Sequence, residues 1–164
     1  MAAWVGVCCW STAHADIQRR VSATVSPLHL ALPMLEGALE YRVEPQLGLA
    51  VIGGYGVIEV DDGFTSTDVT VLEIGGQARY YLEDFSGWHA GVEALYLLAE
   101  APGAVAEGLA AGAFGGWKYI GASGFTFSAQ LGAATVGIVA ESAGSEDDSG
   151  SLEVLLNLDF GWSL

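Results

Sequence analysis

Positive charge is scarce in this sequence. Its 164 residues include 5 Lys or Arg side chains against 20 Asp or Glu, which gives a formal charge of −15. Nucleic acid is a polyanion that would repel such a chain, so we expect no DNA or RNA partner. Charged residues make up only 15% of the chain and Lys118 is its single lysine, whereas soluble domains cover their surface with interspersed charges of both signs. We therefore expect something other than water to cover much of the surface.

The sequence also lacks the residue patterns of metal sites and common catalytic sites. Its 2 cysteines, Cys8 and Cys9, are adjacent, which suits neither a framework disulfide nor a metal site. The 3 histidines, His14, His29 and His89, do not have metal-ligand spacing. We find no Gly-x-Ser-x-Gly elbow, phosphate loop or dinucleotide fingerprint. The sequence therefore predicts no enzymatic activity, no metal and no cofactor.

The N-terminus has the pattern of a cleaved export signal. Ala2–Trp10 is apolar, and Ala13–Ala15 forms a small-x-small cleavage site, so residues 1–15 would be removed. No Lys or Arg precedes the apolar run, which suggests a misplaced or truncated start. A lipoprotein signal fits less well, because Cys8 is not preceded by the usual small residue. We expect residues 16–164 to form the mature domain.

The long apolar segments favour strands over helices. Tyr119–Ala140 is long enough for a transmembrane helix, but its four glycines would each weaken one. Within it, Phe125–Leu131 alternates apolar and polar residues with the period of two that strands have. Ala101–Gly116 is also rich in alanine, but it contains five glycines and Glu107. We therefore predict strands in both segments.

Alternation predicts eight strands and is clearest in the last one. From Leu152 to Leu164, every second residue is apolar, and on the other face only Leu155 breaks the polar pattern. The expected strands are Val21–Leu32 with a break at Pro27, Leu35–Val43, Leu47–Ile58, Thr70–Leu82, Trp88–Leu98, Leu109–Tyr119, a segment that begins at Phe125, and Leu152–Leu164. An even number of strands is typical of single-chain barrels in bacterial outer membranes. The predicted fold is therefore all-β, an eight-stranded antiparallel up-and-down transmembrane β-barrel.

The connections between these strands alternate in length, which indicates a membrane barrel. Short connections are expected at Val43–Gln46, Glu83–Gly87 and Ile120–Gly124. Longer, acidic connections are expected at Glu59–Asp68, Ala99–Glu107 and Ala140–Gly150. Membrane barrels combine short periplasmic turns with longer outer loops. The connection near Pro33 and Met34 is short and does not fit this pattern.

Aromatic residues are expected to collect at one rim of this barrel. If both termini are periplasmic, eight aromatics fall at strand ends or starts of the same level, where rings prefer the membrane interface. They are Tyr41, Tyr80, Trp88, Trp117, Tyr119, Phe125, Phe160 and Trp162. A soluble core would have no reason to place them at one level.

The polar face of the strands carries ionisable residues that would point into a narrow lumen. They are Glu40, Arg42, Glu73, Arg79, His89, Glu93, Lys118 and Asp159. Such a set suits a proton or ion path or acid/base catalysis, but charges in a narrow lumen must be paired to be tolerated. We therefore predict a structural ion-pair network that plugs the lumen. In it, Arg79 should contact a carboxylate from Glu40, Glu93 or Asp159.

Several short motifs carry a family resemblance. Leu156–Leu164 looks like the C-terminal signal of outer-membrane proteins, with apolar residues at alternate positions and Leu164 where an aromatic usually stands. Together with Glu40–Arg42, Ala78–Leu82, Gly116–Tyr119 and Gly124–Thr126, it resembles small bacterial outer-membrane barrels of uncharacterised function and, more loosely, the OmpA and OmpX type. The resemblance implies assembly by the outer-membrane insertion machinery, which would recognise the last strand.

These patterns predict a monomeric barrel in the outer membrane of a Gram-negative bacterium, with the lipid bilayer as partner and a structural or surface-interaction role. A narrow channel for ions or small solutes, a lipid-modifying enzyme with His89 as base, and a soluble lipocalin-like binding barrel are the alternatives. The acidic segment Glu141–Asp148 lacks EF-hand spacing, so we expect a solvated loop tip rather than a calcium site.

Overall fold

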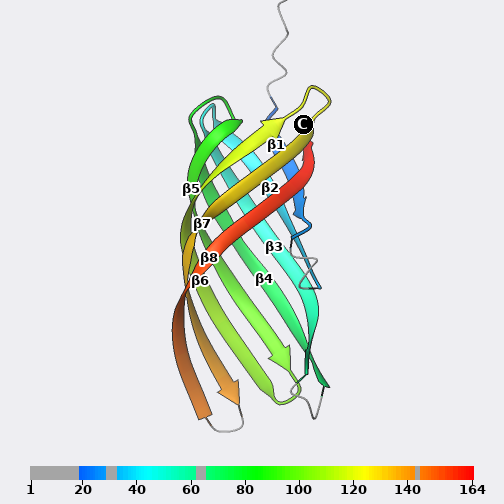
Figure 1. Cartoon of the computed structure of the whole chain (residues 1–164), viewed down its shortest axis with the longest axis vertical. Coiled ribbons are helices and arrows are strands. Elements are labelled where there is room, and N and C mark those ends of the chain that lie inside the picture. Colours follow the sequence, from blue (N-terminus) through cyan, green and yellow to red (C-terminus); the bar gives the residue numbers. More distant parts are fainter. Residues whose placement is uncertain (1–18, 29–32, 62–65, 143–144) are drawn as a thin grey trace, which may run out of the picture.

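A computed structural model describes residues 19–28, 33–61, 66–142 and 145–164 of the chain. The predicted export segment, residues 1–15, lies outside these described residues. Within them, no helix is long and apolar enough to cross a membrane. The described residues form a single closed β-sheet (Figure 1).

The sheet is an eight-stranded antiparallel up-and-down barrel, which confirms the predicted all-β architecture and the number of strands. Its strands are β1 (Val21–Ser26), β2 (Met34–Glu44), β3 (Leu47–Asp61), β4 (Ser66–Tyr81), β5 (Gly87–Ala101), β6 (Ala104–Ile120), β7 (Phe125–Ser142) and β8 (Ser145–Ser163). Each strand pairs antiparallel with the next, and β8 pairs with β1 to close the barrel. Closure matters because an open edge would leave backbone N–H and C=O groups unpaired.

The strands extend further than the sequence predicted at one end of the barrel. The expected loop Ala99–Glu107 is wrong, because β5 and β6 pair as far as Ala101 opposite Ala104. The expected loop Ala140–Gly150 is also wrong, because β7 and β8 pair as far as Ser142 opposite Ser145. A strand can continue where apolar and polar residues no longer alternate, because its backbone N–H and C=O groups still bond to the neighbouring strand of the hairpin. The connections are therefore long hairpins, which project from the end opposite the C-terminus (Figure 1).

The first strand is shorter than predicted. It ends at Ser26, just before Pro27, whose ring nitrogen cannot donate a hydrogen bond to a neighbouring strand. Residues 29–32, which the prediction included in this strand, lie outside the described residues. β1 and β8 pair only from Ser22 opposite Ser163 to Val25 opposite Phe160. Among the described residues, none pairs with the β1 side of β8 before Phe160.

Side chains alternate between the interior and the outer surface, as the pleat requires. In β8 the outward residues match the prediction: Val154 and Leu156 are exposed, whereas Asn157 and Asp159 are buried inside the barrel. The outer surface elsewhere also consists mainly of exposed apolar side chains, such as Leu131, which is 62% exposed. The buried residues of the interior are mostly polar or charged. The barrel therefore has an apolar outside and a polar inside.

The seam between β1 and β8 is held by backbone contact and by interior hydroxyl groups. The Ser22 and Ser163 hydroxyls lie 2.6 Å apart, and the Ser26 hydroxyl donates to Oδ1 of Asn157 at 2.7 Å. Gly161 lets the two strands approach closely, because a Cβ at this position would stand 1.9 Å from the carbonyl oxygen of Ala23. A side chain at position 161 would therefore push the seam apart.

Replacing Gly161 with alanine should destabilise the barrel. The new methyl group would meet backbone atoms that cannot move aside, and we expect the free energy of unfolding to fall by about 1–3 kcal/mol. Urea unfolding followed by tryptophan fluorescence would measure it. The control is Gly137→Ala in β7, where a Cβ meets no atom within 4 Å. Equal stability of the two variants would show that the seam is not closely packed in solution.

Candidate functional site

The carboxylate of Glu40 is the centre of a group of charged side chains inside the barrel. Nη1 of Arg79 donates to Oε2 of Glu40 at 3.1 Å, and Nζ of Lys118 donates to the same oxygen at 2.8 Å. The Tyr81 hydroxyl donates to Oε1 of Glu40 at 2.7 Å. We call these four residues the inner cluster. The predicted contact between Arg79 and a carboxylate is confirmed, with Glu40 as the partner.

The inner cluster joins strands that are not neighbours in the sheet. Glu40 lies on β2, Arg79 and Tyr81 on β4, and Lys118 on β6. Nζ of Lys118 also donates to the Ser22 hydroxyl of β1 at 2.9 Å. All four side chains of the cluster are almost fully buried, so each charge depends on these partners for compensation. The cluster therefore ties opposite walls of the barrel together.

The short connection after β4 contributes an aromatic ring to this end of the interior. Phe85 is only 2% exposed, and its ring centroid lies 3.7 Å from Nζ of Lys118, a cation–π contact. Its backbone N–H donates to the carbonyl oxygen of Pro45 in the neighbouring short turn at 3.0 Å. Its φ of 51° is unusual for a residue with a side chain and turns the connection inward. Alternation could not identify Phe85, because it lies outside a strand.

Three other residues predicted to point into the lumen, His89, Asp159 and Arg42, lie outside the inner cluster. His89 is buried beside the rings of Tyr81 and Phe114, with centroid distances of 5.1 Å and 6.1 Å. Asp159 is buried inside the barrel on β8. Arg42 lies at the end with the short turns, where it forms an ion pair with the exposed Asp84 rather than with an interior carboxylate.

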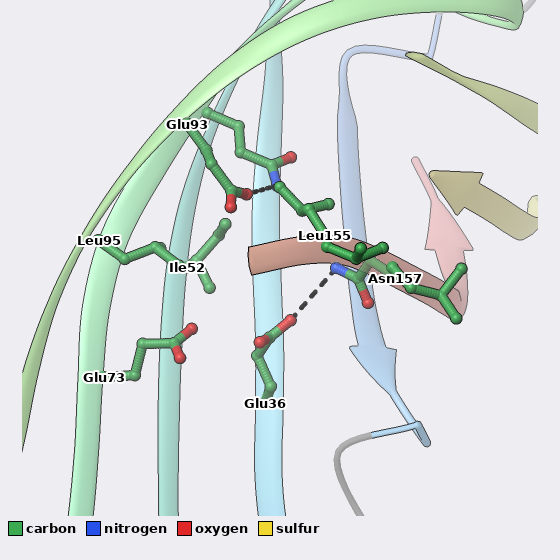
Figure 2. A pocket seen from close by; sticks show the side chains of 10 residues that line it. Glu36, Ile52, Glu73, Glu93, Leu95, Leu155 and Asn157 are labelled. Atoms are coloured by element: carbon green, nitrogen blue, oxygen red, sulfur yellow. Dashed lines mark hydrogen bonds between the residues drawn. The ribbon is translucent and has the colours of Figure 1, made fainter. Parts of the chain in front are cut away.

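Glu73 and Glu93 lie in a second region, further from the short turns. There they line a cavity of about 160 Å³ together with Glu36, Gln77, Leu155 and Asn157, among others (Figure 2). Nε2 of Gln77 donates to Glu93 at 2.8 Å, and Nδ2 of Asn157 donates to Glu36 at 3.4 Å. We call this cavity the acidic chamber. Glu36 also lies inside the barrel, although it was not among the ionisable residues predicted to point into the lumen.

Charge is unevenly divided along the interior. Both cations with buried side chains, Arg79 and Lys118, contact Glu40, and no Lys or Arg lines the acidic chamber. Arg19, at the short-turn end, donates to backbone carbonyl oxygens of Gly121 and Ala122. Of the described residues that line the chamber, none is a Lys or Arg, and the amides of Gln77 and Asn157 donate to the carboxylates of Glu93 and Glu36. Among the described residues, no group of His, Cys, Asp and Glu is arranged to hold a metal ion.

The eight predicted rim aromatics are all exposed on the outer surface. Several are in contact with one another or with Phe127. The Trp117 and Tyr119 rings are 6.1 Å apart, those of Phe125 and Trp162 are 6.2 Å apart, and those of Phe127 and Phe160 are 5.0 Å apart. They lie on β6, β7 and β8 near the connection between Ile120 and Phe125. These ring pairs form aromatic patches on the outer surface at the end with the short turns.

The sequence matches no model of a known protein family and no curated protein. The geometry of the barrel is therefore the basis for the function proposed below. Three features of it matter most: the apolar outer surface with its aromatic rim, the inner cluster and the acidic chamber.

Removing the charge of Glu40 should destabilise the barrel strongly. Glu40→Gln leaves the buried cations Arg79 and Lys118 without their shared carboxylate, and breaking a buried ion pair costs about 3–5 kcal/mol. Urea unfolding of the purified variant would measure this loss. Glu44→Gln, at an exposed position of the same strand, is the matched control and should change little. Similar stability of both variants would mean that the inner cluster does not hold the barrel walls.

Proposed function

We propose that this chain is an integral β-barrel of a bacterial outer membrane, with a structural or surface-interaction role and no enzymatic activity. The observation that carries the proposal is the band of exposed apolar side chains around the barrel. Val92, at the middle of β5, is 57% exposed, and Ile74 of β4 is 56% exposed. Soluble monomers rarely expose contiguous apolar patches larger than a few hundred Å², whereas a lipid bilayer would cover such a band.

The height of this band fits a membrane. Outward positions carry no charge along Thr70–Tyr80 of β4, Trp88–Leu98 of β5 and Leu109–Tyr119 of β6. Each span is close to the ~9–11 residues that a tilted membrane strand requires. Beyond it, exposed carboxylates follow at Glu100 and Glu107. The aromatic rim bounds the band at the other end, where rings favour the bilayer interface.

The two ends of the barrel suggest an orientation. The short turns and the aromatic rim would face the periplasm, and the long acidic hairpins would face the outside. Export by residues 1–15 and insertion through the C-terminal strand β8, as in barrels of the OmpA and OmpX type, complete the proposal. A monomer suffices, because the sheet closes on itself through the pairing of β1 with β8.

The interior favours a structural role over a channel. Tyr81, Phe85 and Lys118 are 0%, 2% and 1% exposed, so side chains fill the interior at the short-turn end. Eight strands leave an interior just wide enough for side chains. We propose that the inner cluster and Phe85 plug the barrel there.

Cell fractionation tests the location. The expected result is that the chain remains in the outer-membrane fraction after a carbonate wash and that only detergent releases it. Mature protein beginning at residue 16 that stays monomeric in detergent-free buffer would support a soluble lipocalin-like barrel instead.

A charged side chain introduced on the outer surface, halfway along the barrel, tests whether lipid or water surrounds this surface. Val92→Arg should lower the free energy of unfolding in lipid vesicles by about 2–4 kcal/mol, because the outward side chain would face the bilayer core. The same substitution at Val43, exposed near the short turns, should cost about 0–1 kcal/mol. Denaturant titration of the vesicle-inserted variants gives both numbers. If Val92→Arg costs no more than Val43→Arg, the band does not face lipid.

A further inference from the structure

The inner surface of the barrel becomes apolar toward the long hairpins. Near the short turns, inward side chains such as Arg79 and Lys118 are charged. Alternation along β3 to β7 identifies the inward residues further out, and all of these are glycine, alanine or aliphatic in Gly54–Ile58, Val69–Val71, Leu97–Ala101, Ala104–Ala110 and Ala134–Ile138. We call this part of the inner surface the outer mouth. Its side chains larger than alanine are Ile58, Val69, Val71, Leu97, Val136 and Ile138.

Water reaches several side chains of the outer mouth. Ile138 of β7 is 38% exposed, and Val71 of β4 and Leu97 of β5 are partly exposed. Deeper in the barrel, Ile52 is only 3% exposed. An inward side chain does not meet solvent through the sheet, because adjacent residues of a strand point to opposite faces. The exposed part of these side chains therefore lies on the inner side of the sheet.

These side chains form an apolar surface that continues from strand to strand. Leu97 and Ile138 approach each other over Gly108 of β6, where a Cβ would stand 3.6 Å from Cβ of Leu97 and 3.5 Å from Cγ1 of Ile138. Leu95 and Ile52 lie at the inner end of this surface, where they line the acidic chamber (Figure 2). The outer mouth is therefore the concave, apolar entrance to an interior that is polar further in.

The charges around the outer mouth are negative. Exposed carboxylates follow toward the hairpin ends at Glu59 of β3, Glu100 of β5 and Glu107 of β6. Every Lys or Arg of the described residues lies in the half of the barrel with the short turns. An anionic ligand would be repelled at this end, and transfer of any charge into an apolar site is costly. The aliphatic side chains also offer no hydrogen bond to a polar ligand. These properties favour an uncharged, apolar occupant.

We propose that the outer mouth binds a small uncharged apolar molecule that enters from the end with the long hairpins. Such a molecule removes apolar side chains from water, which is favourable by about 25 cal/mol for each Å² of apolar surface. Barrels of eight strands have room for one small ligand, and the mouths of barrels are frequent ligand sites. Cavities lined by aliphatic side chains bind molecules of the size of benzene. The site uses only the inner face of the sheet, so it does not depend on the membrane location proposed above.

Titration with toluene, followed by NMR of the isotope-labelled mature protein in a maltoside detergent, tests the proposal. The expected result is saturable shifts at the inward residues Val71, Leu97 and Val136. Their outward neighbours Leu72 and Leu98 meet only toluene dissolved in the detergent, so their shifts should grow without saturation. Benzoate has the same ring with a negative charge, and it should bind at least tenfold more weakly. Equal affinity for benzoate, or no saturable shift at the inward residues, would overturn the proposal.

Two substitutions at adjacent residues of β5 separate the inside of the barrel from its outside. Leu97→Gln places a polar side chain in the outer mouth and should weaken toluene binding at least fivefold. Leu98→Gln makes the same change on the outward face, and the affinity should stay within twofold. Ala106→Phe fills the mouth without adding polarity, and it serves as the test if Leu97→Gln does not fold. Unchanged affinity in a folded variant of the mouth would refute the site, whereas toluene binding by a protein that fractionates as water-soluble would overturn only the membrane location.

Discussion

A closed sheet has two faces, and the pleat assigns each strand residue to one of them. In this chain that constraint decides almost everything else, since a slip of one residue would exchange the apolar outside with the polar inside. Glu40 shows the consequence most clearly. Its position on β2 directs its carboxylate to the interior, where Arg79, Lys118 and Tyr81 from two other strands supply its hydrogen bonds. The correct register is thereby stabilised by charge as well as by the apolar surface.

The few positively charged side chains of this chain are concentrated toward one end of the barrel. Arg79 and Lys118 are committed to Glu40, and Arg42 pairs with Asp84 at the short-turn end. Deeper in the interior, Glu93 accepts a hydrogen bond from the Gln77 amide and Glu36 accepts one from the Asn157 amide. The interior near the short turns, which holds the inner cluster, is therefore close to balanced in charge. The acidic chamber further along the barrel is acidic.

Period-two alternation could predict the fold and the contents of each face, because it is a local property of the chain. The inward positions of Arg79 and Asp159 and the outward position of Leu156 follow directly from it. The acidic chamber could not be predicted, because Glu36 and Glu93 meet only through the curvature of the sheet. The positions of the hairpin ends could not be predicted either, because β5 and β6 continue to pair beyond the residues that alternate. Phe85 lies in a turn, where no periodicity applies, and only its unusual φ and burial reveal its role.

The brevity of β1 has a mechanical consequence. Among the described residues, β1 and β8 pair only from Ser22 to Val25 of β1, whereas β7 and β8 pair along their whole length. Segments with fewer cooperative hydrogen bonds open at lower free energy than the rest of a structure. The pairing between β1 and β8 should therefore open at the lowest free energy in the barrel. There the two strands would separate and pair again while the remaining strands stay folded.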